Sequence, residues 1–139
     1  MSMVDAREEL SDAQALTASA DSTNVVDLTQ TARQIGAGKP MFVHFNVPVA
    51  ASTGNANETY EFRIATGAAA SLGTSLNALA IARGTLIAGY KFSMAFPNVG
   101  VLRYVGVEYV LGGTSPTITM DAYISDQEAP SWAPYADAI

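Results

Sequence analysis

One histidine and no cysteine occur among the 139 residues, and these counts limit the chemistry that the chain can perform. His44 is the only side chain whose ordinary pKa suits a general base near neutral pH. Residues 42–46 around it contain no carboxylate at strand spacing that could orient the imidazole ring. A lone strand histidine is more often a packing or interface residue, so we expect a protein that is not an enzyme.

The sequence also offers little for a metal or a cofactor. A chain without cysteine has neither a thiolate metal site nor a disulfide, and a metal site of the cupin type needs several histidines. Residues 36–39, Gly-Ala-Gly-Lys, resemble a phosphate-binding loop, but Pro40 stands where Ser or Thr would coordinate magnesium. Asp126 and Glu128 lack the spacing of an EF-hand. We therefore expect no metal site and no cofactor.

Paired carboxylates are the remaining source of chemistry, because glycoside cleavage needs two of them facing each other. The body of the chain offers Glu58, Glu61, Glu108 and Asp121. Glu58 and Glu61 lie three positions apart on a predicted strand and therefore point to opposite faces. No spacing predicts a pair, and we expect all four carboxylates to be solvated at the surface.

The elements that would position these residues are β-strands. Residues 59–66, 89–96, 101–111 and 117–124 alternate apolar and polar side chains, and turn residues recur at short intervals. Strands are predicted over residues 13–18, 23–29, 40–47, 58–66, 75–82, 89–96, 101–111 and 116–125. The predicted fold is all-β, a single antiparallel jelly-roll β-sandwich of about eight strands with extended N- and C-terminal arms.

The length of the chain predicts one domain, residues 1–139. Its parts are an N-terminal arm (1–10), the β-sandwich (11–125) and a C-terminal aromatic tail (126–139). The tail holds the only tryptophan, and its two prolines favour an extended path. Two interpretations stay open: the tail folds back over its own sandwich, or it reaches a neighbouring subunit.

The composition predicts a surface that partners cover. Hydrophobic residues make up 49% of the chain and charged residues only 14%, against roughly 25% in an ordinary soluble domain. A net charge of −6 without a cluster of Lys or Arg argues against nucleic acid as a partner. No segment reaches the roughly 18 apolar residues of a membrane helix. Residues 1–10 lack the features of a secretory signal, so we expect no membrane partner and synthesis in a cytoplasm.

Several blocks of the sequence resemble one family of viral proteins. They are LSDAQALTA (10–18), STNVVDL (22–28), IGAGKPM (35–41), TLIAGYKF (85–92) and LRYVGV (102–107). Across residues 10–125 the chain is similar to the jelly-roll capsid cement, or decoration, proteins of tailed bacteriophages. The resemblance implies a homotrimer on the outer capsid surface of the virion, at threefold and quasi-threefold positions. It implies synthesis in the host cytoplasm and no catalytic residues. It also implies that the trimer contacts the major capsid protein and neighbouring cement trimers.

Eleven residues are the candidates for these contacts. The first strands would contribute polar and edge residues to the trimer or capsid contact, namely Leu10, Asp12, Gln14, Thr17, Thr23 and Asn24. Phe42 and His44 share the second face of their strand and would pack against another subunit. Trp132, Pro134 and Tyr135 would anchor the tail on a neighbouring cement or capsid subunit.

Two other functions stay open. One is a carbohydrate- or receptor-binding jelly-roll module of a phage fibre or tail, because six tyrosines and one tryptophan could stack on sugars. Most of these aromatic residues sit at core-facing strand positions, which leaves few for an exposed platform. The other is a small hydrolase whose activity depends on His44.

Overall fold

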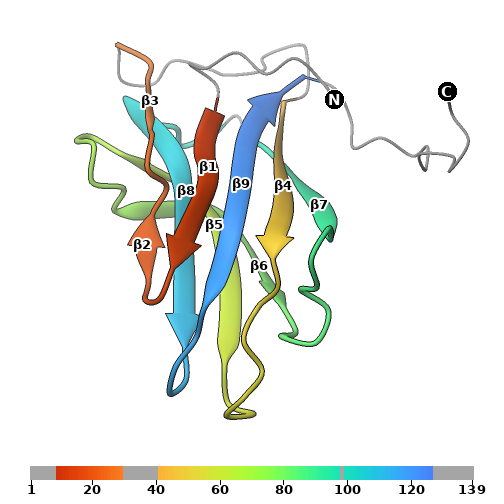
Figure 1. Ribbon diagram of the computed structural model, residues 1–139. Helices are drawn as coiled ribbons and strands as arrows, with labels where there is room; N and C mark the ends of the chain where they lie inside the picture. The colour runs from red at the N-terminus through yellow and green to blue at the C-terminus, as the bar shows by residue number, and fades with distance from the viewer. Residues whose placement is uncertain (1–8, 30–40, 98, 127–139) are drawn as a thin grey trace, which may run out of the picture.

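The computed structural model describes residues 9–29, 41–97 and 99–126, and this part of the chain forms strands and no helix (Figure 1). Its nine strands make two antiparallel sheets that lie face to face. The inner faces of both sheets supply one continuous hydrophobic core. The predicted all-β sandwich is therefore confirmed.

The sheet nearer the viewer in Figure 1, called the front sheet, has the strand order β1-β9-β4-β7. Its strands are β1 (Glu9–Leu16), β9 (Ile118–Ser125), β4 (Phe42–Val49) and β7 (Lys91–Ala95). Each neighbouring pair is antiparallel. The strand at the start of the described chain thus lies beside the strand at its end.

The second sheet, called the back sheet, has the order β2-β8-β5-β6, with β3 also paired to β8. Its strands are β2 (Ala20–Asp21), β3 (Val26–Asp27), β8 (Tyr104–Gly112), β5 (Thr59–Gly67) and β6 (Thr74–Ile81). The pairing of β5 with β8 is regular along the full length of both strands. These two strands form the centre of the back sheet.

The core follows from the alternation that the sequence shows. Tyr60, Phe62 and Ile64 of β5 are almost fully buried, and so are Val43 and Phe45 of β4 in the opposite sheet. The rings of Phe45 and Phe62 meet between the sheets with their centroids 5.8 Å apart. Burying an apolar side chain of this size stabilises a fold by about 1.5–3 kcal/mol, so these residues supply much of the driving force.

Six of the eight predicted strands match β4 to β9 to within three residues at each end. They include β6, which the sequence predicted in a segment rich in Ala, Leu and Ser. The structure differs over the first strands. In place of strands at 13–18 and 23–29, β1 begins at Glu9 and two strands of two residues each follow.

The reason for this difference lies in β1 itself. The register of β1 against β9 shifts between Glu9 and Ser11 and again between Ser11 and Gln14, and Ala13 has a φ of 47°. These bulges interrupt the period of two that identifies a strand in the sequence. Residues 9 and 10, which we assigned to an N-terminal arm, therefore belong to the sandwich.

Candidate interaction surfaces

The contact residues predicted in the N-terminal segment are of three kinds: buried in the core, hydrogen-bonded within the chain, or exposed. Leu10 is fully buried in the core, so its side chain is not available to a partner. The Gln14 side chain joins β1 to the segment after it: Oε1 accepts from Ser11 Oγ and from the Thr23 N–H, and Nε2 donates to Asp21 O. Gln14 is therefore committed to contacts within its own chain.

Four of the predicted contact residues are exposed: Asp12, Thr17, Thr23 and Asn24. Asn24 also joins the segment after β2 to the start of β1, because its N–H donates to Leu10 O and its Nδ2 donates to Glu9 O. These four side chains lie at or near the β1 edge of the front sheet, where a neighbouring subunit could reach them.

Three polar groups fix the bulge of β1 on the outer face of the front sheet. The Asp121 carboxylate of β9 accepts from the Ala13 N–H at 2.6 Å and from Asn46 Nδ2 of β4 at 3.1 Å. The other amide atom of Asn46, Oδ1, is buried and has no hydrogen-bond partner among the described residues. Asp121 thus holds a strained backbone position and does not serve as a free surface carboxylate.

An aromatic cluster (Phe42, His44 and Tyr123) lies on the same outer face. The His44 ring stacks on Tyr123 with centroids 5.1 Å apart, and the Phe42 ring centroid is 6.3 Å from that of His44. His44 Nδ1 is 2.7 Å from Ser93 Oγ. The strand register explains this grouping, since His44 lies opposite Tyr123 on one side and opposite Ser93 on the other.

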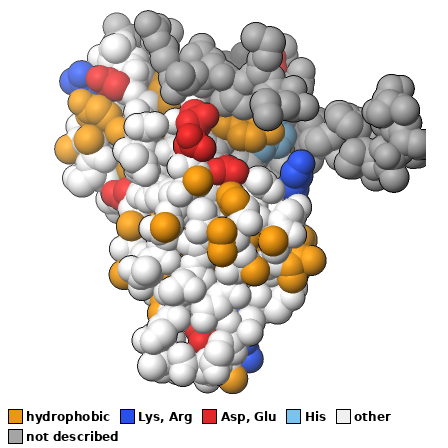
Figure 2. Space-filling model, viewed as in Figure 1, with side chains coloured by type: hydrophobic (Ala, Val, Ile, Leu, Met, Phe, Trp, Pro, Cys, Tyr) orange, Lys and Arg blue, Asp and Glu red, His pale blue; other side chains and the backbone are white. Residues whose placement is uncertain are grey.

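A partner could reach the rings of Phe42 and Tyr123 in this cluster more easily than the imidazole of His44. His44 is only 5% exposed, whereas Phe42 and Tyr123 are half-buried. Figure 2 looks onto this face and shows small groups of hydrophobic side chains across its middle, with acidic and basic side chains above them. The face is therefore suited to apolar contact with another protein surface.

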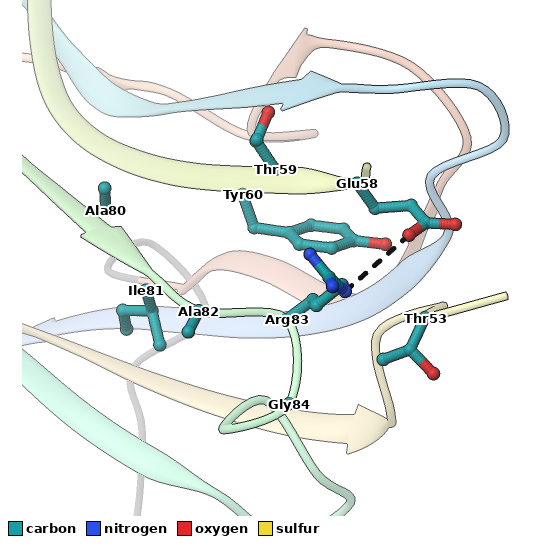
Figure 3. A pocket seen from close by; sticks show the side chains of 9 residues that line it. All are labelled: Thr53, Glu58, Thr59, Tyr60, Ala80, Ile81, Ala82, Arg83 and Gly84. Carbon is teal, nitrogen blue, oxygen red and sulfur yellow. Dashed lines mark ion pairs between the residues drawn. The ribbon is translucent and has the colours of Figure 1, made fainter. Parts of the chain in front are cut away.

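A shallow cleft opens between the β4–β5 loop and the end of β6 (Figure 3). Here the expectation of a solvated surface carboxylate is wrong for Glu58, which is 2% exposed. The Asn55 N–H donates to Glu58 Oε1 at 2.7 Å and holds the pKa of this carboxyl below its usual range, although burial acts in the opposite direction. Glu58 Oε2 has no hydrogen-bond partner among the residues that the structure describes, and Arg83 Nε lies 4.0 Å from it.

This cleft lacks the aromatic surface that a sugar site needs. The Tyr60 ring lines it, but Tyr60 is 2% exposed and its hydroxyl is held by Ser52 O and Thr117 O. A buried ring presents no face on which a sugar could stack. The Glu58–Arg83 pair therefore orders the end of the sandwich and does not support the carbohydrate-binding alternative.

Sequence reasoning missed Tyr123 and Asp121 as parts of the front face. Their outward direction is readable from the alternation over residues 117–124, but their proximity to Phe42 and His44 depends on the pairing of β4 with β9. No local pattern reveals a pairing between strands so far apart in the chain. Trp132, Pro134 and Tyr135 lie outside the described residues.

No group of three or more His, Cys, Asp or Glu side chains in residues 9–29, 41–97 and 99–126 could hold a metal ion. Within the same ranges, no helix has the length and hydropathy to cross a membrane.

The comparisons with known proteins place the chain in a family. No curated protein matches it. The sequence model of the Bbp16 family matches residues 10–124, which include every strand from β2 to β8 and nearly all of β1 and β9. The chain therefore belongs to the Bbp16 family.

Proposed function

We propose that this protein is a capsid cement protein of a tailed bacteriophage. It binds the outer surface of the head at threefold and quasi-threefold positions as a homotrimer, and it stabilises the shell by bridging subunits of the major capsid protein. The observation that carries the proposal is the aromatic cluster on the outer face of the front sheet, where Phe42 and Tyr123 lie half-buried on either side of His44.

The strand order supports the jelly-roll form of this proposal. A jelly roll packs two four-stranded sheets built from two Greek keys, so that strands distant in sequence become neighbours. Here β1-β9-β4-β7 lies against β2-β8-β5-β6, and β1 pairs with β9 at the opposite end of the described chain. Such a sandwich presents broad, rigid faces to its partners.

The aromatic cluster supplies the kind of side chain that anchors a protein interface. Phe42 and Tyr123 are held on paired strands, so little conformational entropy is lost when a partner covers them. Aromatic residues are enriched at the centres of interfaces. A trimer would present this cluster three times, which raises the overall affinity by about 10² to 10⁴ over one contact.

Phe42→Ser combined with Tyr123→Ser tests the proposal in a reconstitution with heads that lack the protein. We expect the double variant to keep its fold but to leave most sites on the heads empty, and the heads to lose heat resistance. Tyr104→Ser is the matched control, because Tyr104 is a half-buried aromatic residue of the back sheet beside Arg103. Full occupancy by the double variant would remove the assigned role of the cluster, and failure of the wild type to bind heads would overturn the function.

A further inference from the structure

The four edges of the sandwich are not protected in the same way. A free sheet edge invites pairing with another chain, and proteins blunt it with bulges, charges or very short strands. In the front sheet, the edge strand β1 is bulged, and the edge strand β7 has only five residues and begins with the exposed Lys91. In the back sheet, β2 and β3 share one edge, and each has two residues, including Asp21 and Asp27. Three edges thus carry a recognised protective device.

The fourth edge, β6, carries no charge and no proline. Residues 64–82, which contain β6, include no charged side chain, and five of the eight residues of the strand are exposed. In the part of the chain that the structure describes, β6 pairs with β5 on one side and with no strand on the other. In an antiparallel pair every second residue points its N–H and C=O away from the partner, so this edge offers an open row of hydrogen-bonding groups.

The regular part of this edge runs from Asn77 to Ile81. The register against β5 shifts at Leu76, and the five residues after it pair with β5 without interruption. Asn77 Oδ1 accepts from the Ala78 N–H at 3.0 Å, a local bond that a pairing strand would replace. Leu79 is 39% exposed, although it lies opposite the fully buried Phe62. An added strand would cover Leu79 and complete the edge of the core.

The order of residues favours a second copy of this chain as the added strand. Around Leu79 the side chains run small, large, small, so an antiparallel copy centred there sets Leu79 against Leu79 and Ala78 against Ala80. Two chains with a net charge of −6 repel each other elsewhere, but residues 64–82 bring no charge to the contact. A twofold contact between identical patches is also the commonest form of self-association.

We infer that β6 pairs antiparallel with β6 of a second copy across a twofold axis near Leu79, which joins the two back sheets into one. This contact is separate from the proposed threefold contact and from binding to the capsid. If the trimer also forms, each of its three β6 edges can pair with a β6 edge of another trimer.

Single-cysteine crosslinking tests the register directly, because the natural chain contains no cysteine. Residues opposite each other in an antiparallel pair have Cα atoms about 4.5–5.5 Å apart, which suits a disulfide. We expect Leu79→Cys to form a covalent dimer rapidly under mild oxidation. Ala70→Cys, at an exposed position of the uncharged loop before β6, should crosslink far more slowly.

Ala78→Lys provides the second measurement, in the full-length protein without cysteine. Ala78 is exposed, so a lysine there places a charge on the edge without entering the core. We expect the molar mass from light scattering to fall, from dimer to monomer or from linked trimers to single trimers, while Ala70→Lys leaves it unchanged. The inference is overturned if Ala78→Lys leaves the mass unchanged, or if the two cysteine variants crosslink at the same rate. Neither readout involves capsids, so failure here is distinct from failure of the proposed function.

Discussion

Ser11 and Tyr109, 98 positions apart in the chain, join the two sheets through hydroxyl oxygens that lie 2.8 Å apart. Ser11 belongs to β1 of the front sheet and Tyr109 to β8 of the back sheet, and both are almost fully buried. Ser11 Oγ donates to Gln14 Oε1, so the Tyr109 hydroxyl is the donor to Ser11. This buried polar chain ties the bulged strand β1 to the centre of the fold.

The first prediction concerns the stability that this contact supplies. Ser11→Ala leaves the buried Tyr109 hydroxyl without its acceptor, and we expect a loss of about 1–3 kcal/mol in the free energy of unfolding. Tyr109→Phe removes the donor and leaves Ser11 bonded to Gln14, so its loss should be smaller, about 1 kcal/mol. Urea unfolding of both variants and of the double variant measures the difference. Equal, negligible losses would show that the contact contributes nothing.

The second prediction concerns alkaline pH. Burial raises the pKa of Tyr109 above its ordinary value of 10.0, and Ser11 offsets only part of this effect. The unfolded chain therefore ionises first as the pH rises, and the stability that is present below pH 10.0 is lost above it. We expect thermal unfolding of Tyr109→Phe to depend less steeply on pH in that range than the wild type. If the melting temperature falls with rising pH equally steeply in both proteins, ionisation of Tyr109 is not the cause of the alkaline loss of stability.

The third prediction concerns Gly106, where a segment of the chain crosses the outer face of β8. A Cβ atom at this position would lie 2.8 Å from Leu72 Cδ1, 3.0 Å from Ser22 Oγ and 3.1 Å from Val25 Cγ1. Gly106→Ala should therefore cost about 1–3 kcal/mol of stability, measured by urea unfolding. Gly73→Ala is the control, since a Cβ there meets nothing within 4 Å. If both variants are as stable as the wild type, the close packing over β8 is not present.

The fourth prediction concerns acid. The pKa of Glu58 is held below its ordinary value of 4.5, chiefly by the Asn55 N–H. This group contributes stability that is complete above that pH and is lost as the pH falls through the lowered value. We expect Glu58→Gln to reduce the acid-induced fall in melting temperature. If the melting temperature of Glu58→Gln falls with acid as steeply as that of the wild type, Glu58 does not supply this stability.

The sequence predicted strands where the alternation of side chains is uninterrupted. Tyr60, Phe62 and Ile64 mark one face of β5 because every second residue of that strand is apolar and buried. The bulge at Ala13 was not predicted, because a bulge shifts the pattern by one residue and its φ of 47° leaves no trace in residue type. The short strand β3 lies inside the longer strand predicted over residues 23–29, and β2 lies between the two strands predicted there.

The candidate surfaces were only partly predictable. Phe42 and His44 were identified from the second face of one strand, but Tyr123 joins them through the pairing of β4 with β9, which is set by the whole fold. Glu58 shares the inward direction of Tyr60, and this signal in the sequence was overlooked because an acidic residue is usually solvated. Hydrogen bonding by Asn55 and the nearby Arg83 make its burial tolerable.

The most direct test of the central claim is the position and copy number of the protein on intact phage particles, measured by electron cryomicroscopy and quantitative mass spectrometry. Our account predicts density on the outer surface of the head at threefold and quasi-threefold positions, with three copies at each. Absence of the protein from the head, or its confinement to the tail or fibres, would contradict the account.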